Sequence, residues 1–289
     1  MIQVHNIFDS RTSTFTYIVW DDASNDSIII DSVLDYEQGG SIVFDESIQQ
    51  VESFLKEKKL IPHFVLETHA HADHLTGAAE IKKRLPSIQI GIGKKITKVQ
   101  GLFKTVFNVK DFNTNGVQFD LLMEEGIVYK AGSLEFKILF TPGHTPACTT
   151  ILVGKYAFTG DALFKPDVGT GRCDFPGGSA EDLYDSVHEK LYKLPEDTVF
   201  CSGHDYPPEG RKENAYSTMD EQRLGNKQLK QSTTKDEYVD FRKARDATLS
   251  APKLIYPSLQ VNIDAGSLPK EEDNNKSYMK VPINKKGDL

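Results

Sequence analysis

The sequence predicts an α+β fold in which two mixed β-sheets pack together with helices outside them. Strand-like and helix-like segments are interleaved along the 289 residues, without the strict strand–helix alternation of a doubly wound parallel sheet. The chain also opens with a pair of strands, and four later strands each end directly before a loop that contains histidine or aspartate. We therefore expect the polar loops to gather at strand ends.

The first half of the chain predicts a hairpin followed by a helix. Residues 15–20 and 27–31 are rich in β-branched and aromatic side chains, and the polar residues 21–26 between them predict the turn. Residues 48–60 have a helical pattern of apolar side chains, and Pro62 is expected to end that helix. The chain therefore begins with antiparallel strands before its first helix.

The next part of the chain predicts short strands that are followed by polar loops. Residues 64–66 predict a buried strand, residues 75–85 a helix, residues 88–92 a strand and residues 134–140 an alternating, half-buried strand. Two further short strands are expected at residues 156–158 and 199–201. The strands at 64–66, 134–140, 156–158 and 199–201 each lead into a candidate ligand.

The second half predicts one capped helix and a less regular tail. Ser179 is a predicted N-cap, and apolar residues at i, i+4 and i+8 from Leu183 indicate an amphipathic helix. After a polar stretch, residues 236–249 predict a helix and residues 259–263 a strand.

Composition narrows the class of protein. Apolar residues make up 38% and charged residues 26%, as in an ordinary globular protein. The chain has neither an apolar run of the ~20 residues that span a bilayer nor a signal-like start, so we expect a cytoplasmic protein without a membrane partner. The net charge of −8 opposes nucleic-acid binding. The three separated cysteines suggest neither a disulfide framework nor paired-cysteine zinc ligation, so a metal must take nitrogen and oxygen ligands.

A dense cluster of metal-ligating side chains follows the strand at 64–66. His69, His71, Asp73 and His74 fall within six residues, too close together for a helical metal motif, and they suit a loop wrapped around cations. Of the eight histidines, five follow predicted strands: His69, His71, His74, His144 and His204. Histidine nitrogen and carboxylate oxygen are expected for catalytic zinc, iron or manganese, with a coordination position left open.

Other motifs are weak when taken alone. His144 lies in the turn-rich segment 141–146, which an ordinary turn also explains, and Asp161 also suits a helix cap. We expect His5, His63 and His188 to be surface or packed histidines.

Together these motifs resemble the metallo-β-lactamase superfamily, in order and approximate separation. The matching segments are 68–74, 143–145, 160–161 and 203–204. The resemblance implies an αββα sandwich with a metal site at one edge, where the two sheets end.

Within that superfamily the chain is similar to the persulfide dioxygenases. The similarity rests on segments 67–77, 170–175, 183–190 and 204–206. Segments 242–249 and 257–263 resemble a bacterial branch that carries a C-terminal extension. The resemblance implies a catalytic domain at 1–210 and an extension at 211–289 that packs on it and contributes to substrate binding.

The resemblance also implies a ligand set. Members of the family hold one Fe(II) per chain, here through His69, His144 and Asp161, in a facial arrangement with open positions. His71, Asp73, His74 and His204 match metal ligands of two-metal hydrolases in the superfamily. In persulfide dioxygenases they instead orient the ligands and relay protons.

The implied reaction oxidises glutathione persulfide with O2 to sulfite and glutathione, in sulfide detoxification. Arginine suits the two carboxylates of glutathione, and the candidates are Arg172, Arg211 and Arg242. Arg172 also suits a structural pair with Asp174, and Tyr206 matches a tyrosine that contacts glutathione in glyoxalase II enzymes. We expect Cys173 to be a packed residue and not a nucleophile.

Two alternatives remain open from the sequence. A glyoxalase II-type hydrolase of S-lactoylglutathione would use two metals and the complete His/Asp set. A non-catalytic protein with a structural metal is disfavoured, because structural sites are usually closed and rich in cysteine. The sequence also leaves open whether the chain forms a homodimer.

Overall fold

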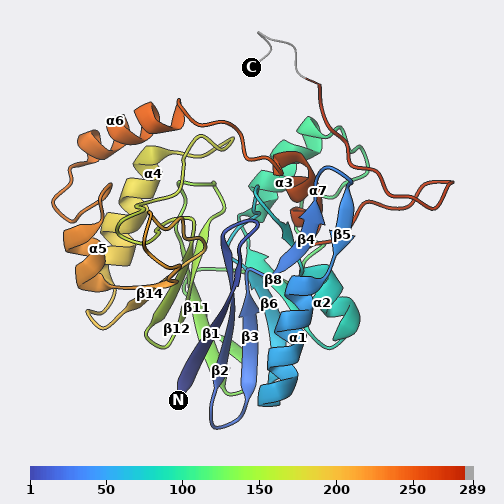
Figure 1. Ribbon diagram of the computed structural model, residues 1–289, viewed down its shortest axis with the longest axis horizontal. Coiled ribbons are helices and arrows are strands. Elements are labelled where there is room, and N and C mark those ends of the chain that lie inside the picture. The colour runs from blue at the N-terminus through green and yellow to red at the C-terminus, as the bar shows by residue number, and fades with distance from the viewer. Residues whose placement is uncertain (284–289) are drawn as a thin grey trace.

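Two six-stranded β-sheets lie at the centre of the molecule, which the computed structural model describes over residues 1–283 (Figure 1). In spatial order the first sheet contains β1 (Ile2–Asp9), β2 (Thr14–Asp21), β3 (Asp26–Ile30), β6 (Ile61–Glu67), β8 (Gln89–Gly93) and β9 (Leu121–Met123). The second contains β10 (Tyr129–Ala131), β11 (Leu134–Phe140), β12 (Thr149–Val153), β13 (Tyr156–Gly160), β14 (Val199–Ser202) and β15 (Tyr216–Thr218). Both sheets combine parallel and antiparallel neighbours, which confirms the prediction of two mixed sheets.

Within residues 1–283, a third, smaller sheet and seven α-helices complete the fold. The small sheet contains, in order, β5 (Ile42–Phe44), β4 (Val33–Glu37) and β7 (Leu75–Thr76). The helices in the described part of the chain are α1 (Glu46–Lys58), α2 (Ala78–Arg84), α3 (Ile96–Val106), α4 (Ala180–Asp185), α5 (Met219–Gly225), α6 (Lys235–Asp246) and α7 (Ile255–Asn262). A π-helical turn (Ser186–Lys190) and a 3-10 turn (Leu191–Lys193) continue α4.

The fold has four layers, helices–sheet–sheet–helices, because alternate side chains of the strands point to opposite faces of each sheet. In β3, Ile28 and Ile30 pack between the two sheets, whereas Ile29 points to the opposite face and packs under the helices. The outer face of the first sheet packs against helices α1, α2, α3 and α7. On the outer face of the second sheet, Ala157 and Phe200 pack against α4. This arrangement is the expected αββα sandwich.

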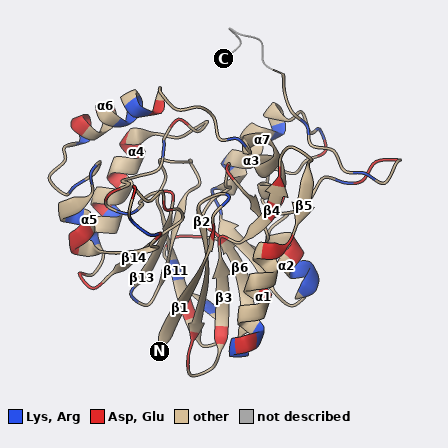
Figure 2. Ribbon diagram, in the orientation of Figure 1, with Lys and Arg blue, Asp and Glu red and all other residues tan. Residues whose placement is uncertain are grey.

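Charged residues are frequent in the helices and in the loops, and fewer of them lie in the strands (Figure 2). Helix α6 has Asp236 and Glu237 in its first turn and Lys243 and Arg245 in its last turn, which complements the helix dipole. None of the helices in residues 1–283 has the length and apolar character needed to cross a bilayer.

Most of the expected elements are present. The hairpin is β2–β3, and the expected first helix is α1, which ends where Lys59 adopts a left-handed conformation. Ser179 caps α4 by accepting a hydrogen bond from the amide of Asp182 at 3.0 Å. Helix α6 confirms the helix expected in the tail, although it ends at Asp246.

Two expectations are wrong. Residues 259–263 do not form a strand: most of them belong to α7, whose backbone amides bond to carbonyls four residues earlier, as Ile263 does to Leu259. The helix expected from residue 75 begins only at Ala78, because Leu75 and Thr76 pair with β4 as strand β7. In both places long-range contacts override the local apolar pattern.

Candidate metal centre

Four strand ends bring the candidate ligands to one end of the sandwich. Strand β6 leads into His69, β11 leads into the loop with His144, β13 leads into Asp161, and β14 leads into His204. Neighbouring strands that end at the same edge place their following loops side by side, as expected from the sequence. The loops therefore supply the ligands, and the sheets fix their positions.

One group consists of His69, His144 and Asp161, whose candidate ligand atoms all lie within 4.8 Å of one another. His144 Nε2 is 3.5 Å from Asp161 Oδ2, and the rings of His69 and His144 meet edge to face with centroids 5.1 Å apart. These are the three residues that the family resemblance assigns to iron.

Hydrogen bonds set the orientation of both histidines in this group. His144 Nδ1 lies 2.7 Å from the carbonyl oxygen of Arg172, which only accepts, so Nδ1 carries the proton and Nε2 keeps its lone pair. The Thr68 hydroxyl donates to Asp31 at 2.9 Å and can therefore accept from His69 Nδ1, which is 3.0 Å away. Nε2 of each ring is thereby left for a metal.

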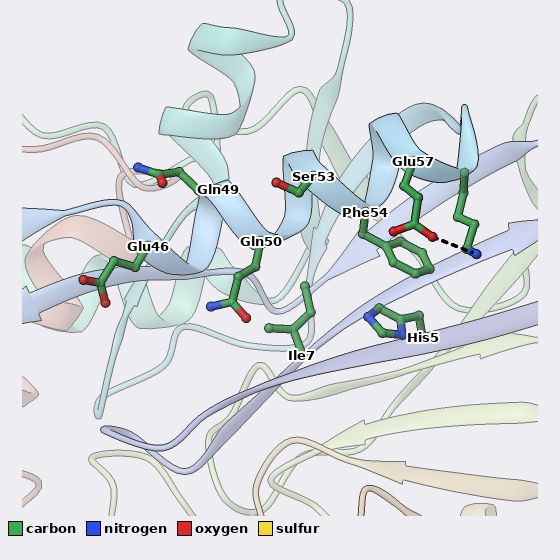
Figure 3. A pocket seen from close by; sticks show the side chains of 9 residues that line it. His5, Ile7, Glu46, Gln49, Gln50, Ser53, Phe54 and Glu57 are labelled. Atoms are coloured by element: carbon green, nitrogen blue, oxygen red, sulfur yellow. Dashed lines mark ion pairs between the residues drawn. The ribbon is translucent and has the colours of Figure 1, made fainter.

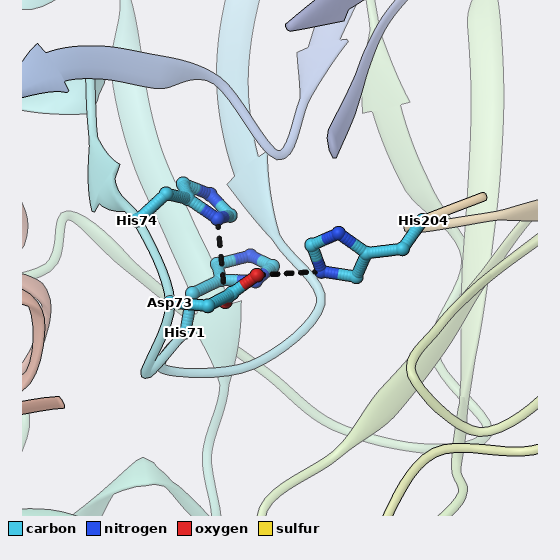
Figure 4. Close-up of side chains that lie close together, drawn as sticks. All are labelled: His71, Asp73, His74 and His204. Carbon is cyan, nitrogen blue, oxygen red and sulfur yellow. Dashed lines mark ion pairs between the residues drawn. The ribbon is translucent and has the colours of Figure 1, made fainter. Parts of the chain in front are cut away.

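A second group contains His71, Asp73, His74 and His204, again with ligand atoms within 4.8 Å (Figure 4). His204 Nε2 is 3.2 Å from Asp73 Oδ2 and 3.4 Å from Asp161 Oδ1, so the two groups adjoin. His74 Nδ1 lies 3.5 Å from Asp73 Oδ1. The structure thus brings together all seven residues that the sequence placed at the site.

The donor atoms of this site fit a metal. Buried polar atoms without a hydrogen-bond partner are costly, yet several converge here: His69 Nε2, His71 Nδ1, His74 Nε2, His204 Nε2 and Asp161 Oδ1. A cation would satisfy them. The set of imidazole nitrogens and carboxylate oxygens suits iron, zinc or manganese.

In the metal-free protein, the surroundings shift the pKa values of His69 and His204 in opposite directions. Burial, together with the neighbouring His71 and His144, lowers the pKa of His69 well below its usual value. Burial also opposes the charged form of His204, but Asp73 and Asp161 outweigh it and raise the pKa of His204. His69 is therefore ready to bind a cation, and His204 is able to hold a proton.

Two acidic residues that sequence reasoning did not assign to the site lie behind His71. Asp31 Oδ1 is 3.1 Å from His71 Nε2, and Asp31 also accepts hydrogen bonds from the Thr68 amide and hydroxyl. Glu67 Oε2 is 3.5 Å from His71 Nε2, and burial raises the pKa of Glu67 to about 7. The only signal in the sequence is an aspartate or glutamate at the end of a buried strand.

The expected substrate-binding residues differ in whether their side chains are exposed or already paired with carboxylates. Tyr206 is 50% exposed, and its ring stacks on His204 with centroids 5.8 Å apart. Arg172 forms two 2.5 Å hydrogen bonds with Asp174, the structural pair that the sequence also allowed. Arg211 pairs with Asp205 and Asp167 at 2.6–3.1 Å.

The prediction that Arg242 binds substrate is wrong. Its side chain is buried, with 3% of the residue exposed, and its guanidinium pairs with Asp246 at 2.5 Å. A guanidinium enclosed in this way is not presented to a substrate carboxylate, because a buried charge requires its partner.

The remaining histidines have partners outside the candidate metal groups, and Cys173 is a packed residue. His5 stacks on Phe54, His63 pairs with Asp26 at 2.6 Å, and His188 stacks on Tyr184. Cys173 is a buried free thiol whose pKa is raised by burial, as expected for a packed residue. A surface groove of about 690 Å³ between β1 and α1, lined by His5 and Phe54 among others, contains none of the candidate ligands (Figure 3).

Comparison with known proteins gives a family match over most of the chain. The family model described as the metallo-beta-lactamase superfamily matches residues 10–204. The chain is 45% identical to "Glyoxylase B2" of Dictyostelium discoideum, with 95% of this chain and 94% of that protein covered. It is 43% identical to a "Beta-lactamase hydrolase-like protein" of Agrobacterium fabrum, over 96% of this chain but only 63% of that protein.

Two further relatives carry the name ETHE1. The chain is 33% identical to human "Persulfide dioxygenase ETHE1, mitochondrial", over 92% of this chain and 89% of that protein. Among solved structures, ETHE1 from Myxococcus xanthus superposes with a TM-score of 0.73 and 28% identity, over 92% of this chain and all of that one.

Proposed function

Because this chain belongs to the metallo-beta-lactamase superfamily, we propose that it is a persulfide dioxygenase acting on glutathione persulfide at one Fe(II). The observation that carries the proposal is the His69–His144–Asp161 group, in which two imidazoles and one carboxylate converge. This donor set is the one used by non-haem iron oxygenases. Relatives named persulfide dioxygenase, at 33% and 31% identity, support the same activity.

The overall change combines glutathione persulfide, O2 and one water to give glutathione and sulfite. His69, His144 and Asp161 would hold the iron, which supplies the redox chemistry that joins oxygen to sulfur. The protein keeps His69 and His144 in the tautomer that frees Nε2, through Thr68 and the Arg172 carbonyl. His204 Nδ1, 3.1 Å from the Ser13 carbonyl, is held as a donor, so Nε2 carries any second proton toward Asp73.

Metal counting and oxygen uptake test this proposal together. Protein purified without oxygen should contain one iron per chain and consume one O2 for each glutathione persulfide. Asp161→Ala should lose both properties, and an exposed control such as Asp22→Ala should keep them. Two zinc ions per chain with no oxygen uptake would overturn the proposal.

A glyoxalase II-type hydrolase is the second candidate. The observation that favours it is the intact second group of His71, Asp73, His74 and His204, which has the composition of a second cation site. The 45% identity to a protein named "Glyoxylase B2" points the same way. Hydrolysis of S-lactoylglutathione by protein loaded with two metals, with no oxygen consumed, would favour this function.

We also propose that residues 1–210 form the catalytic domain and that residues 211–289 form an extension of it. Arg172, Asp174, Arg211 and Tyr206 remain our candidates for glutathione contacts. Tyr206 combines exposure with stacking on His204, so Tyr206→Ala should raise KM for glutathione persulfide more than it lowers kcat. A cytoplasmic location likewise remains a proposal.

A further inference from the structure

Two helices of residues 211–289 reach the metal centre through buried polar side chains. Helix α6 lies beside α4, and α7 lies beside β7, so the two helices approach from opposite sides (Figure 1). Each carries polar residues that face inward: Arg242 and Asp246 on α6, and Asn262 on α7, with exposed fractions of 3%, 5% and 3%. Buried polar groups of this kind must find specific partners.

Arg242 and Asp246 bond to each other and to backbone groups of one loop, and Arg242 Nη1 also donates to Gln228 Oε1 at 3.1 Å. Asp246 Oδ2 accepts from the Cys173 amide at 2.8 Å, while Asp246 Oδ1 accepts from Arg242 Nη2 at 2.5 Å. Arg242 Nη1 lies 3.4 Å from the carbonyl oxygens of both Thr170 and Gly171. The ion pair therefore fixes the loop 170–173 at both of its ends.

The same loop touches two of the three residues assigned to iron. The Arg172 carbonyl accepts from His144 Nδ1 at 2.7 Å, and the Gly171 amide donates to the Asp161 carbonyl at 3.0 Å. A Cβ on Gly171 would collide with that carbonyl oxygen, so the loop and Asp161 are in close contact. The Thr170 carbonyl, which Arg242 contacts, and the Gly171 amide, which contacts Asp161, belong to one peptide group. The Cys173 amide, which Asp246 contacts, and the Arg172 carbonyl, which contacts His144, belong to another.

Asn262 holds the other ligand-bearing loop in a similar way. Its Nδ2 donates to the carbonyl oxygens of His71 and His74, both at 2.8 Å, and its Oδ1 accepts from the Thr76 amide at 2.8 Å. These three bonds span the segment that contains His71, Asp73 and His74. The amide group is fully used, and each bond goes to the metal-binding loop or to the strand directly after it.

We propose that Arg242, Asp246 and Asn262 are positioning residues for the metal centre, so that the extension completes the scaffold that holds the ligands. The proposal rests on the metal site proposed above but not on the reaction performed there. Outer partners of metal ligands typically change metal affinity by about 10- to 100-fold when lost. The extension would then act on the metal through the backbone of both loops, without contributing a ligand.

Two variants test this role on the full-length protein. In Arg242→Met/Asp246→Leu both charges are removed, so no unpaired charge stays buried, while the Cys173 amide loses its acceptor. Asn262→Asp keeps the size and the acceptor for the Thr76 amide, but it removes the two donated bonds and places a carboxylate oxygen against the carbonyl oxygens of His71 and His74. Asp240→Asn, at an exposed position on α6, is the control.

The readouts are the affinity for Co²⁺ alone, the visible absorption spectrum of bound Co²⁺, and urea unfolding of the metal-free protein. We expect both variants to bind Co²⁺ about 10- to 100-fold more weakly and with altered absorption bands, while the control matches the native protein. Native affinity and spectrum in a folded variant would overturn the proposal, as would a loss of stability alone. If the double variant does not fold, Asn262→Asp decides the outcome. Persulfide oxidation is not measured, so failure of the proposed activity leaves this test intact.

Discussion

Replacing Asp31 with alanine should lower the free energy of unfolding by about 3–5 kcal/mol, the usual cost of breaking a buried ion pair. Asp31 is 1% exposed and accepts three hydrogen bonds, at 2.8 and 2.9 Å from Thr68 and 3.1 Å from His71. Each bond to a carboxylate contributes about 1.5–3 kcal/mol, but the three share one partner and are not additive. The loss is a large part of a typical domain stability of about 5–15 kcal/mol.

Urea unfolding of the metal-free protein at pH 7, followed by circular dichroism, measures this loss. Burial raises the pKa of Asp31, but His71 and Thr68 outweigh burial and lower it, so the carboxylate is ionised at pH 7. Its contribution is therefore present at neutral pH and is lost as the pH falls below the ordinary value of about 4. Asp22→Ala, at an exposed position in the turn of the β2–β3 hairpin, should change stability by less than about 0.5 kcal/mol. A loss below about 1 kcal/mol for Asp31→Ala would refute the reasoning.

Three further changes have distinct expected outcomes. Asp161→Ala should leave less than one metal per chain after loading and desalting, measured by elemental analysis, and full occupancy would contradict its role as a ligand. Gly171→Ala should cost about 1–3 kcal/mol in urea unfolding, because the methyl group collides with the Asp161 carbonyl, whereas Gly101→Ala, which meets no atom within 4 Å, should be neutral or stabilising. Burial raises the pKa of Asp264 to about 6, so native stability should fall as the pH rises from about 4 to 6. Asp264→Asn should flatten that profile in thermal unfolding and gain about 1 kcal/mol at pH 7, since the carboxyl group is partly solvated; an unchanged profile would contradict this.

Features with a local cause could be predicted from the sequence. The hairpin β2–β3 follows from two β-rich runs around a polar turn, and the cap at Ser179 follows from one hydroxyl beside a helical pattern. The metal centre was predictable for a related reason. The candidate ligands are chemically distinctive and follow directly after predicted strands, which predicted a metal site of nitrogen and oxygen donors. The family resemblance then selected His69, His144 and Asp161, which the structure brings together.

Tertiary structure decided the features that depend on partners distant in the sequence. The apolar pattern at residues 259–263 suits a strand or a helix, and docking beside β7 selected the helix α7. Arg242 was a candidate because arginine suits a substrate carboxylate, yet Asp246 and the loop 170–173 enclose it. Asp31 and Asn262 are ordinary polar residues until the fold places them behind the ligands. Candidate metal ligands can be recognised from the sequence because few side chains bind metals. The residues that orient those ligands cannot, because their hydrogen bonds join segments that only folding brings together.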